Sequence, residues 1–198
     1  MSTRDQFIAT AQRLFAAKGF YGVSIAAIAQ QMGLTKQALL HHFGSKEKLY
    51  GEVLQRISGE LMACTDEIIA SRVDPLERLT ELVLAQYRLQ MADQDAARLI
   101  MRELLDNEPR AGAAANWYLK PYLETLVDTL LSINSARERS RGQALAAIYQ
   151  FLGAAHYFAV SQPTLGRMFG DALYNEARQH YEEELRQMIE SRLTIAAR

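Results

Sequence analysis

The stretch from Ser24 to Lys46, SIAAIAQQMGLTKQALLHHFGSK, constrains the fold of this chain most, because it predicts two short helices joined by a tight turn. Its first half carries apolar residues at spacings of three and four, the pattern of an amphipathic helix capped by Ser24. Gly33 follows, and glycine readily adopts the left-handed conformation that ends a helix. Thr35 then caps a second helix over residues 36–43. A helix, a glycine turn and a capped helix within about twenty residues make a helix-turn-helix unit.

Two further helices are expected to flank this unit. Residues 4–18 have a broad apolar face, and Gly44-Ser45 caps a helix that begins at Lys46. Leu34, in the turn, is predicted to be a buried corner. The small core that these helices could share consists of Phe7, Phe15, Ile25, Ile28, Leu39 and Phe43.

The rest of the chain also has helical rather than strand-like patterning, with few glycines and prolines. We predict an all-α fold of eight to ten helices: an N-terminal three-helix bundle with the helix-turn-helix over residues 1–48, and a larger helical domain for effector binding and dimerisation over 49–198. Helices are expected over 45–72, from Pro75, from Asp93 or Asp95, within 109–133, over 139–161 and over 171–193, with 161–171 as a loop.

Charge is unevenly distributed along the chain. The net charge is −1, but residues 1–50 hold six Lys or Arg and two acidic residues, a local charge of +4. The positive charge coincides with the helix-turn-helix, so a polyanion is the expected partner of that end.

The sequence also predicts a cytoplasmic protein that does not cross a membrane. The N-terminus lacks the pattern of a signal peptide, and no apolar run approaches the roughly 18 residues of a membrane span. Cys64 is the only cysteine, which excludes an intrachain disulfide and a cysteine-cluster metal site.

The second helix of the unit has a buried and an outward face. Leu39 and Phe43 define the buried face, and Gln37 and His41 point away from it. Such a helix fits the DNA major groove, where Lys can donate to guanine, Gln can pair with adenine, and a small residue can approach a thymine methyl group. Base contacts are therefore expected from Lys36, Gln37 and Ala38, and phosphate contacts from Thr35, His42 and Lys46.

The segment GVSIAAIAQQMGLTKQALLHHFGSKEKLY resembles the DNA-binding signature of TetR-family transcriptional regulators, and the resemblance covers residues 5–50. It implies a homodimer that binds a palindromic operator in double-stranded DNA, usually as a repressor, and releases it when a small molecule enters the C-terminal domain. The family often has a tyrosine that contacts DNA where this chain has Leu40, so Leu40 is expected to alter the operator preference. The predicted DNA-binding residues are Ser24, Thr35, Lys36, Gln37, Ala38, Leu40, His41, His42 and Lys46.

The C-terminal domain offers two further sets of candidates. Aromatic residues with polar tips and a few polar neighbours suit an effector pocket, for which we name Tyr87, Met91, Arg102, Trp117, Tyr118, Tyr149 and His156. The last two long helices are apolar over more than one face, which favours a four-helix interface between two subunits. Its predicted residues are Ile148, Leu152, Ala155, Tyr181 and Leu185.

No catalytic motif is found, so neither an enzyme nor a cofactor or metal is expected; His180 with Glu184 is the only weak metal pair. Two alternatives remain open. The chain could be an all-α small-molecule-binding protein or enzyme whose helix-turn-helix is only structural. It could also bind DNA without any effector.

Overall fold

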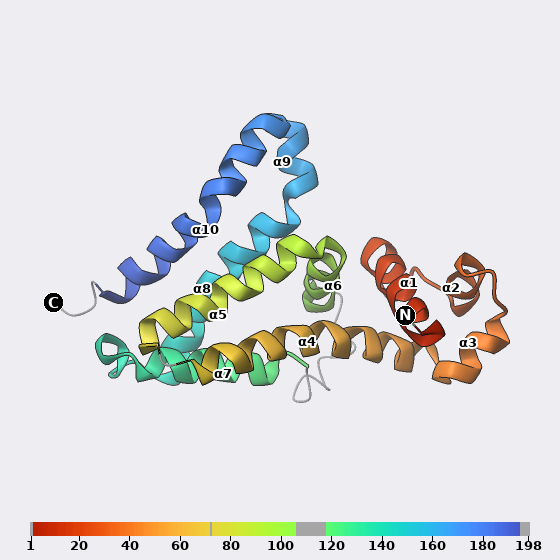
Figure 1. The fold of residues 1–198 in the computed structure, drawn as a ribbon, viewed down its shortest axis with the longest axis horizontal. Helices are drawn as coiled ribbons and strands as arrows, with labels where there is room; N and C mark the ends of the chain where they lie inside the picture. The colour runs from red at the N-terminus through yellow and green to blue at the C-terminus, as the bar shows by residue number, and fades with distance from the viewer. Residues whose placement is uncertain (1, 72, 106–117, 195–198) are drawn as a thin grey trace. The chain divides into compact units, whose positions relative to one another are not determined.

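The computed structural model of this chain describes residues 2–71, 73–105 and 118–194, which form ten α-helices, one short 3₁₀ helix and no strand (Figure 1). The predicted all-α fold of eight to ten helices is thereby confirmed. Internal contacts divide the chain into two compact units. Unit 1 comprises Met1–Glu60 and Asp93–Tyr118, and unit 2 comprises Leu61–Ala92 and Leu119–Arg198.

Unit 1 contains α1 (Thr3–Lys18), α2 (Ile25–Gln31), α3 (Lys36–Phe43), the first part of α4 (Lys46–Ala70) and α6 (Gln94–Leu105). All six residues predicted for its core are buried. Leu34 is an exception to the predicted pattern, because 39% of its surface is exposed. Its backbone N–H closes the end of α2 by donating to the Ala29 carbonyl (2.9 Å), which fixes the turn without burying the side chain.

Unit 2 contains the rest of α4 with α5 (Pro75–Ala92), α7 (Lys120–Ser132), the 3₁₀ helix η2 (Asn134–Ala136), α8 (Arg141–Val160), α9 (Gln162–Phe169) and α10 (Asp171–Thr194). Helix α5 is central, because it packs against α7, α8 and α10. Its large apolar side chains are buried with those of its neighbours, and the fully enclosed ones include Leu79, Leu82, Leu84, Leu126 and Phe151. The Tyr122 hydroxyl donates to the Leu82 carbonyl at 2.9 Å, which ties α7 to α5.

Helix α9 corrects the loop predicted over 161–171. Pro163 lies in its first turn, where proline is tolerated because the missing N–H would have no partner in the helix, and Gly170 ends it with a φ of 82°. None of its residues is buried. Leu165, Met168 and Phe169 are spaced three and four residues apart, but a stripe of three residues over two turns is too short for periodicity to distinguish a helix from a loop.

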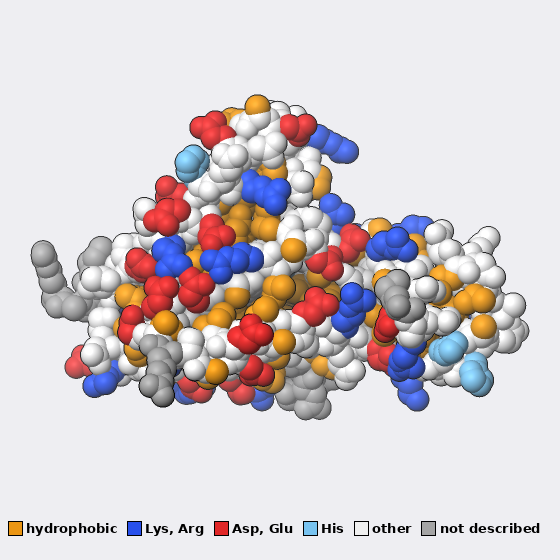
Figure 2. All heavy atoms as spheres, in the orientation of Figure 1, with side chains coloured by type: hydrophobic (Ala, Val, Ile, Leu, Met, Phe, Trp, Pro, Cys, Tyr) orange, Lys and Arg blue, Asp and Glu red, His pale blue; other side chains and the backbone are white. Residues whose placement is uncertain are grey.

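Ion pairs link α5 to α10 on the surface of unit 2, where acidic and basic side chains are interspersed (Figure 2). Arg186 of α10 pairs with Glu77 and Glu81, and Arg88 of α5 pairs with Glu81 and Glu182. Desolvation lowers the pKa of the Arg186 guanidinium group, but the hydrogen bonds that it donates to Glu81 and Glu77 outweigh this effect and the pKa is raised. The pKa of Arg88 is raised by its hydrogen bonds to Glu182 and Glu81, again against desolvation. Among the described helices none alone has the length and composition of a membrane span; α8 and α9, bent by 61° at their junction, meet that test only as a pair.

Candidate nucleic-acid interface

Helix α3 is a two-turn helix held at both ends. At its N-terminus the Thr35 hydroxyl accepts a hydrogen bond from the Ala38 N–H at 3.2 Å, as the sequence predicts. At its C-terminus Gly44 takes a φ of 75° and donates its N–H to the Leu40 carbonyl at 2.7 Å. Between these caps, Leu39 and Phe43 are buried and anchor the helix in unit 1.

The preceding helix and turn also follow the sequence prediction. The Ser24 hydroxyl caps α2 by accepting from the Ala27 N–H at 3.1 Å. Gly33 lies in the turn with a φ of 66°, a backbone conformation that residues other than glycine rarely adopt. The hydroxyls of Ser24 and Thr35 therefore define where the two helices begin.

The outward face of α3 carries most of the residues predicted to contact DNA. Lys36, Gln37, His41 and His42 are exposed, and Ala38 and Leu40 between them are half-buried. Figure 2 shows histidine side chains at the surface in the region of α3. This face presents cationic, amide and imidazole groups, all of which can donate hydrogen bonds to phosphates or base edges.

Lys46, the first residue of α4, is half-buried. Its ammonium group lies 4.2 Å from the centroid of the Phe20 ring, a cation–π contact. Phe20 in turn packs against the ring of Tyr50 at 4.9 Å. The sequence prediction treated Lys46 only as a phosphate ligand and missed this aromatic support, which joins residues distant in sequence.

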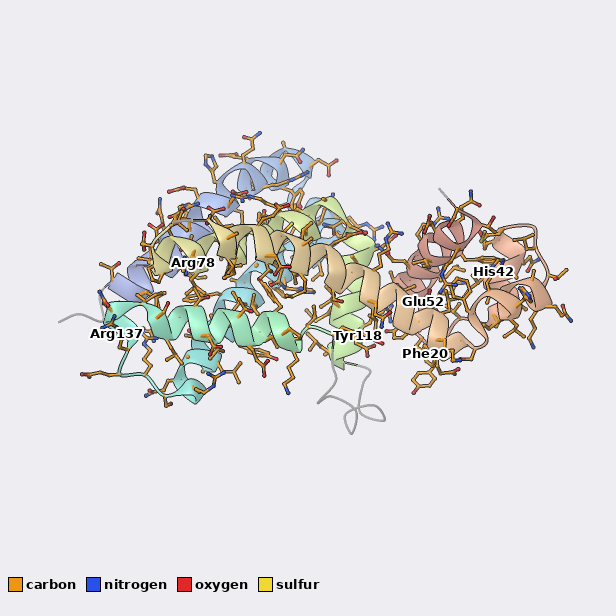
Figure 3. The ribbon with its side chains drawn as sticks, turned by 60° about the horizontal axis from the view of Figure 1, so that its bottom comes forward. Phe20, His42, Glu52, Arg78, Tyr118 and Arg137 are labelled. Carbon is orange, nitrogen blue, oxygen red and sulfur yellow. The ribbon has the colours of Figure 1, made fainter. Side chains whose placement is uncertain are left out.

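Arg4 also escaped the sequence prediction, which used only its charge. Its Nη1 donates to the carbonyl of His42 at 3.2 Å, and its Nη2 pairs with Oε1 of Glu52 at 2.5 Å. The guanidinium carbon lies 4.8 Å from the centroid of the Phe43 ring. Figure 3 labels His42 on α3 and Glu52 on α4, the two helices that Arg4 of α1 connects. No spacing rule links residues that are 38 and 48 positions apart.

Helix α6 is bound to the same unit at both of its ends. At its N-terminus Asp93 accepts from the Ala96 N–H (2.9 Å) and from Gln12 Nε2 of α1 (2.7 Å). Toward its C-terminus Arg102 donates to the carbonyls of Ala16 (2.9 Å) and Ala17 (3.1 Å), the end of α1. Arg102, a predicted pocket residue, therefore lies against α1.

A buried hydrogen bond adds to these contacts. The Tyr50 hydroxyl of α4 donates to Oε2 of Glu103 in α6 at 2.5 Å. Tyr50 and Glu103 are 4% exposed each, so this polar pair is almost fully removed from water. Buried polar groups are normally hydrogen-bonded, and this bond joins α6 to α4.

The structure divides the other predicted pocket residues. Tyr87 and His156 are buried in unit 2, Met91 is half-buried there, and Tyr149 is exposed. His156 Nδ1 lies 2.8 Å from Gln90 Nε2, while burial raises the pKa of Tyr87 to about 12. Tyr118 belongs to unit 1, where its hydroxyl lies beside Gly51, and Trp117 lies outside the described residues (Figure 3).

The residues predicted for a dimer interface all belong to unit 2, where most of them are buried. Ile148, Ala155 and Leu185 belong to its buried core, and Leu152 and Tyr181 are partly buried against it. The apolar side chains that α8 leaves exposed stand at the neighbouring positions Leu145, Tyr149 and Tyr157.

The described residues contain no group of three or more histidine, cysteine, aspartate and glutamate side chains that could hold a metal ion. Two cavities lie apart from the predicted sites. One of about 1070 Å³ in unit 2 borders η2 and the end of α10, and one of about 590 Å³ in unit 1 borders α1 and the start of α6. Neither is lined by a residue predicted for the effector pocket.

Comparison with known proteins relates this geometry to a family. Residues 7–53 match the profile of the bacterial regulatory proteins of the tetR family. The chain is 28% identical over 143 residues to the HTH-type transcriptional activator FasR of Mycolicibacterium smegmatis, covering 72% of this chain and 65% of that protein. It is 34% identical over 86 residues to the HTH-type transcriptional repressor KstR2 of the same organism, covering 43% of this chain and 42% of that protein. Each match thus spans less than two thirds of the relative.

Solved structures share the fold over nearly the whole chain. A TetR-family transcriptional regulator from Bordetella parapertussis superimposes with a TM-score of 0.72 at 22% identity, covering 94% of this chain and 93% of that one. The fatty acid degradation regulator FadR from Bacillus halodurans gives a TM-score of 0.67 at 19% identity, covering 92% and 96%. At such identities the likeness concerns the fold alone.

Proposed function

We propose that this chain, which belongs to the tetR family of bacterial regulatory proteins, is a cytoplasmic, ligand-responsive repressor that binds a palindromic operator as a homodimer. The observation that carries the proposal is the outward face of α3. Lys36, Gln37 and His41 are exposed there, while Leu39 and Phe43 hold the helix from beneath. A supported helix with a polar outer face can enter the major groove as a rigid reading element.

Within this interface the residues have different proposed tasks. Lys36 and Gln37 read base edges, and the half-buried Ala38 and Leu40 approach thymine methyl groups. Thr35, His42 and Lys46 contact phosphates, and Ser24 and Thr35 keep the two helices in register through their caps. Leu40 replaces a hydrogen-bonding tyrosine by an apolar side chain, which favours a thymine-containing step at that position.

Dimerisation is proposed to use the exposed side of α8 together with α10. Leu145, Tyr149 and Tyr157 lie at multiples of four residues on α8 and are 41%, 49% and 73% exposed. Residues four positions apart are neighbours on a helix surface, and each such step turns by about 40°, so these three side chains spread over about 120° of α8. Pairing two such faces about a two-fold axis would present two α3 helices to major grooves about 34–36 Å apart.

The effector is proposed to bind in unit 2 near Tyr87, Met91 and His156. The rings of Tyr87, Phe158 and Tyr181 lie together there, and the buried Gln90–His156 pair adds polar groups on α5 and α8, the helices of Tyr87 and Phe158. Side chains of these kinds suit a small molecule with an apolar body and one hydrogen-bonding group. The ligand releases DNA only if it prefers the conformation that misaligns the two α3 helices. Helix α4 is proposed to transmit this conformational change, because it is continuous from Lys46 to Ala70.

Selection of duplexes from a random pool by the full chain tests the proposal. We expect an enriched palindrome whose binding weakens steeply with salt, since phosphate contacts release counterions. A selection at low salt that enriches no palindrome would contradict the regulator proposal and favour a structural helix-turn-helix.

The variant Gln37→Ala tests whether the Gln37 side chain contacts a base. We expect it to lower discrimination at a single base pair by about 1–3 kcal/mol, because one bidentate contact is lost. Gln55→Ala, which removes the same side chain from an exposed site on α4, serves as the matched control. Competition binding with operators altered one base pair at a time gives the measurement, and equal profiles for the two variants would show that Gln37 does not read DNA.

A further inference from the structure

Arg4 occupies an unusual place for a charged side chain at the start of a helix. Three contacts converge on its guanidinium group: the carbonyl of His42, the carboxylate of Glu52 and the ring of Phe43. These residues belong to the last turn of α3 and to α4, so a single side chain of α1 connects all three helices.

The contact with His42 is made at the C-terminal end of α3. Backbone carbonyls in the last turn of a helix lack partners within the helix and carry its partial negative charge. A guanidinium group placed there both satisfies a carbonyl and interacts favourably with the helix dipole. Glu52 accepts from the same group and limits its motion, and the Phe43 ring beneath it supplies a cation–π contact.

The short length of α3 makes this contact consequential for DNA reading. Eight residues at a rise of 1.5 Å span about 12 Å, so a tilt of about 10° displaces one end from the other by about 2 Å. Such a displacement exceeds the tolerance of a hydrogen bond to a base edge. Leu39 and Phe43 anchor the helix from beneath, so a further restraint at the His42 end limits the tilt that would displace Lys36 and Gln37 at the other end.

We infer that Arg4, held by Glu52, is a positioning residue for α3: it sets the orientation of this helix and thereby sequence discrimination, without itself contacting DNA. The inference rests on the proposed function of α3 as the DNA-reading helix. The Arg4–Glu52 pair is too exposed, at 48% and 26% for the two side chains, to contribute much to the stability of the fold. Its principal effect is therefore orientation.

The competing explanation is that Arg4 binds a DNA phosphate directly. The variant Glu52→Gln distinguishes this explanation from positioning of α3 by Arg4. This variant removes a negative charge from unit 1. If only charge mattered, it would leave DNA binding unchanged or tighten it. If Glu52 holds Arg4 against α3, it should lower the ratio of operator to random-duplex affinity severalfold. Arg4→Ala should lower that ratio about tenfold, with the slope of log affinity against log salt unchanged.

Arg13→Ala is the matched control, because it removes an exposed arginine from the same helix, one that donates to the Thr10 hydroxyl in the preceding turn. It should keep the wild-type ratio. A salt slope reduced by about one in Arg4→Ala, with an unchanged ratio, would make Arg4 a phosphate ligand and overturn the inference. Equal ratios for Arg4→Ala, Glu52→Gln and Arg13→Ala would overturn it as well.

Hydrogen exchange of the free protein tests the same point without DNA. Arg4→Ala should speed exchange of the amides in the last turn of α3, residues 40–44, more than those of α1, and Arg13→Ala should not. Absence of this difference contradicts the inference even if the variants bind DNA normally. If the exchange difference is present but the wild-type chain enriches no operator, the proposed function fails while the structural link between Arg4 and α3 stands.

Discussion

Leu34 and Leu39 are five residues apart in the helix-turn-helix, and the structure treats them oppositely. Leu39 is fully buried in the core of unit 1, while Leu34 is 39% exposed in the turn. We expect Leu39→Ala to lower the free energy of unfolding by about 2–5 kcal/mol, because it loses apolar contact and leaves a cavity. Leu34→Ala, the same chemical change, should lower the free energy of unfolding by no more than about 1 kcal/mol. Urea denaturation followed by circular dichroism measures both, and similar losses would contradict the assigned burial.

Single residues were predictable where their effect is local. Ser24, Gly33 and Thr35 act within three or four positions of themselves, so the sequence pattern alone indicates their roles as caps and turn. Arg4 and Arg102 act across dozens of positions, on His42 and on the end of α1 respectively. Sequence patterns carry no information about such contacts, because they depend on how the helices pack.

Helix α6 contacts helices that are distant from it in sequence, because it belongs to unit 1 together with α1. Arg102 supplies two of the hydrogen bonds that hold it to α1. Hydrogen bonds from a charged group contribute about 1.5–3 kcal/mol, so Arg102→Ala should speed amide exchange in α6 about ten- to hundredfold. Arg98→Ala, which removes an arginine whose guanidinium group pairs with Asp95 of the same helix, is the control. Unchanged exchange in Arg102→Ala would show that the hydrogen bonds of Arg102 are not needed to hold the helix.

At the scale of elements, the sequence predicts a helix best where one of its faces is buried. Helix α3 was placed over Lys36–Phe43 because caps flank an apolar stripe, and these are its bounds in the structure. Helix α9 was missed because its eight residues are too few for a clear helical pattern, and none of them is buried. The effector and dimer candidates depended on which apolar face of α5, α8 and α10 turns inward, and helices apolar on several sides do not reveal that.

Across the whole molecule, several buried or partly buried tyrosines make the stability of the fold decrease at alkaline pH. Burial raises the pKa of Tyr87 to about 12 and also raises the pKa of Tyr122, Tyr174 and Tyr181. In the unfolded chain a tyrosine ionises near pH 10, so the folded state holds these protons more tightly. Their contribution to stability is therefore complete below about pH 10 and is lost as pH rises toward 12.

This dependence can be assigned to individual side chains. Urea midpoints measured from pH 8 to 11.5 should fall above about pH 10 for the wild type and less steeply for Tyr87→Phe. Tyr21→Phe, at a position 67% exposed, should keep the wild-type slope. A Tyr87→Phe slope equal to that of the wild type would contradict the role of this buried hydroxyl.

The membership of α6 in unit 1 bears on how such a regulator could be recombined with others. The chain leaves unit 1 after Glu60 and returns to it at Asp93, so the unit is assembled from two separate lengths of sequence. A chimera that grafts only the first sixty residues onto a foreign sensor would strip α1 of its partners Asp93 and Arg102. A transplant that keeps unit 1, the proposed DNA-reading unit, intact would have to include α6 or redesign the surface that α6 covers.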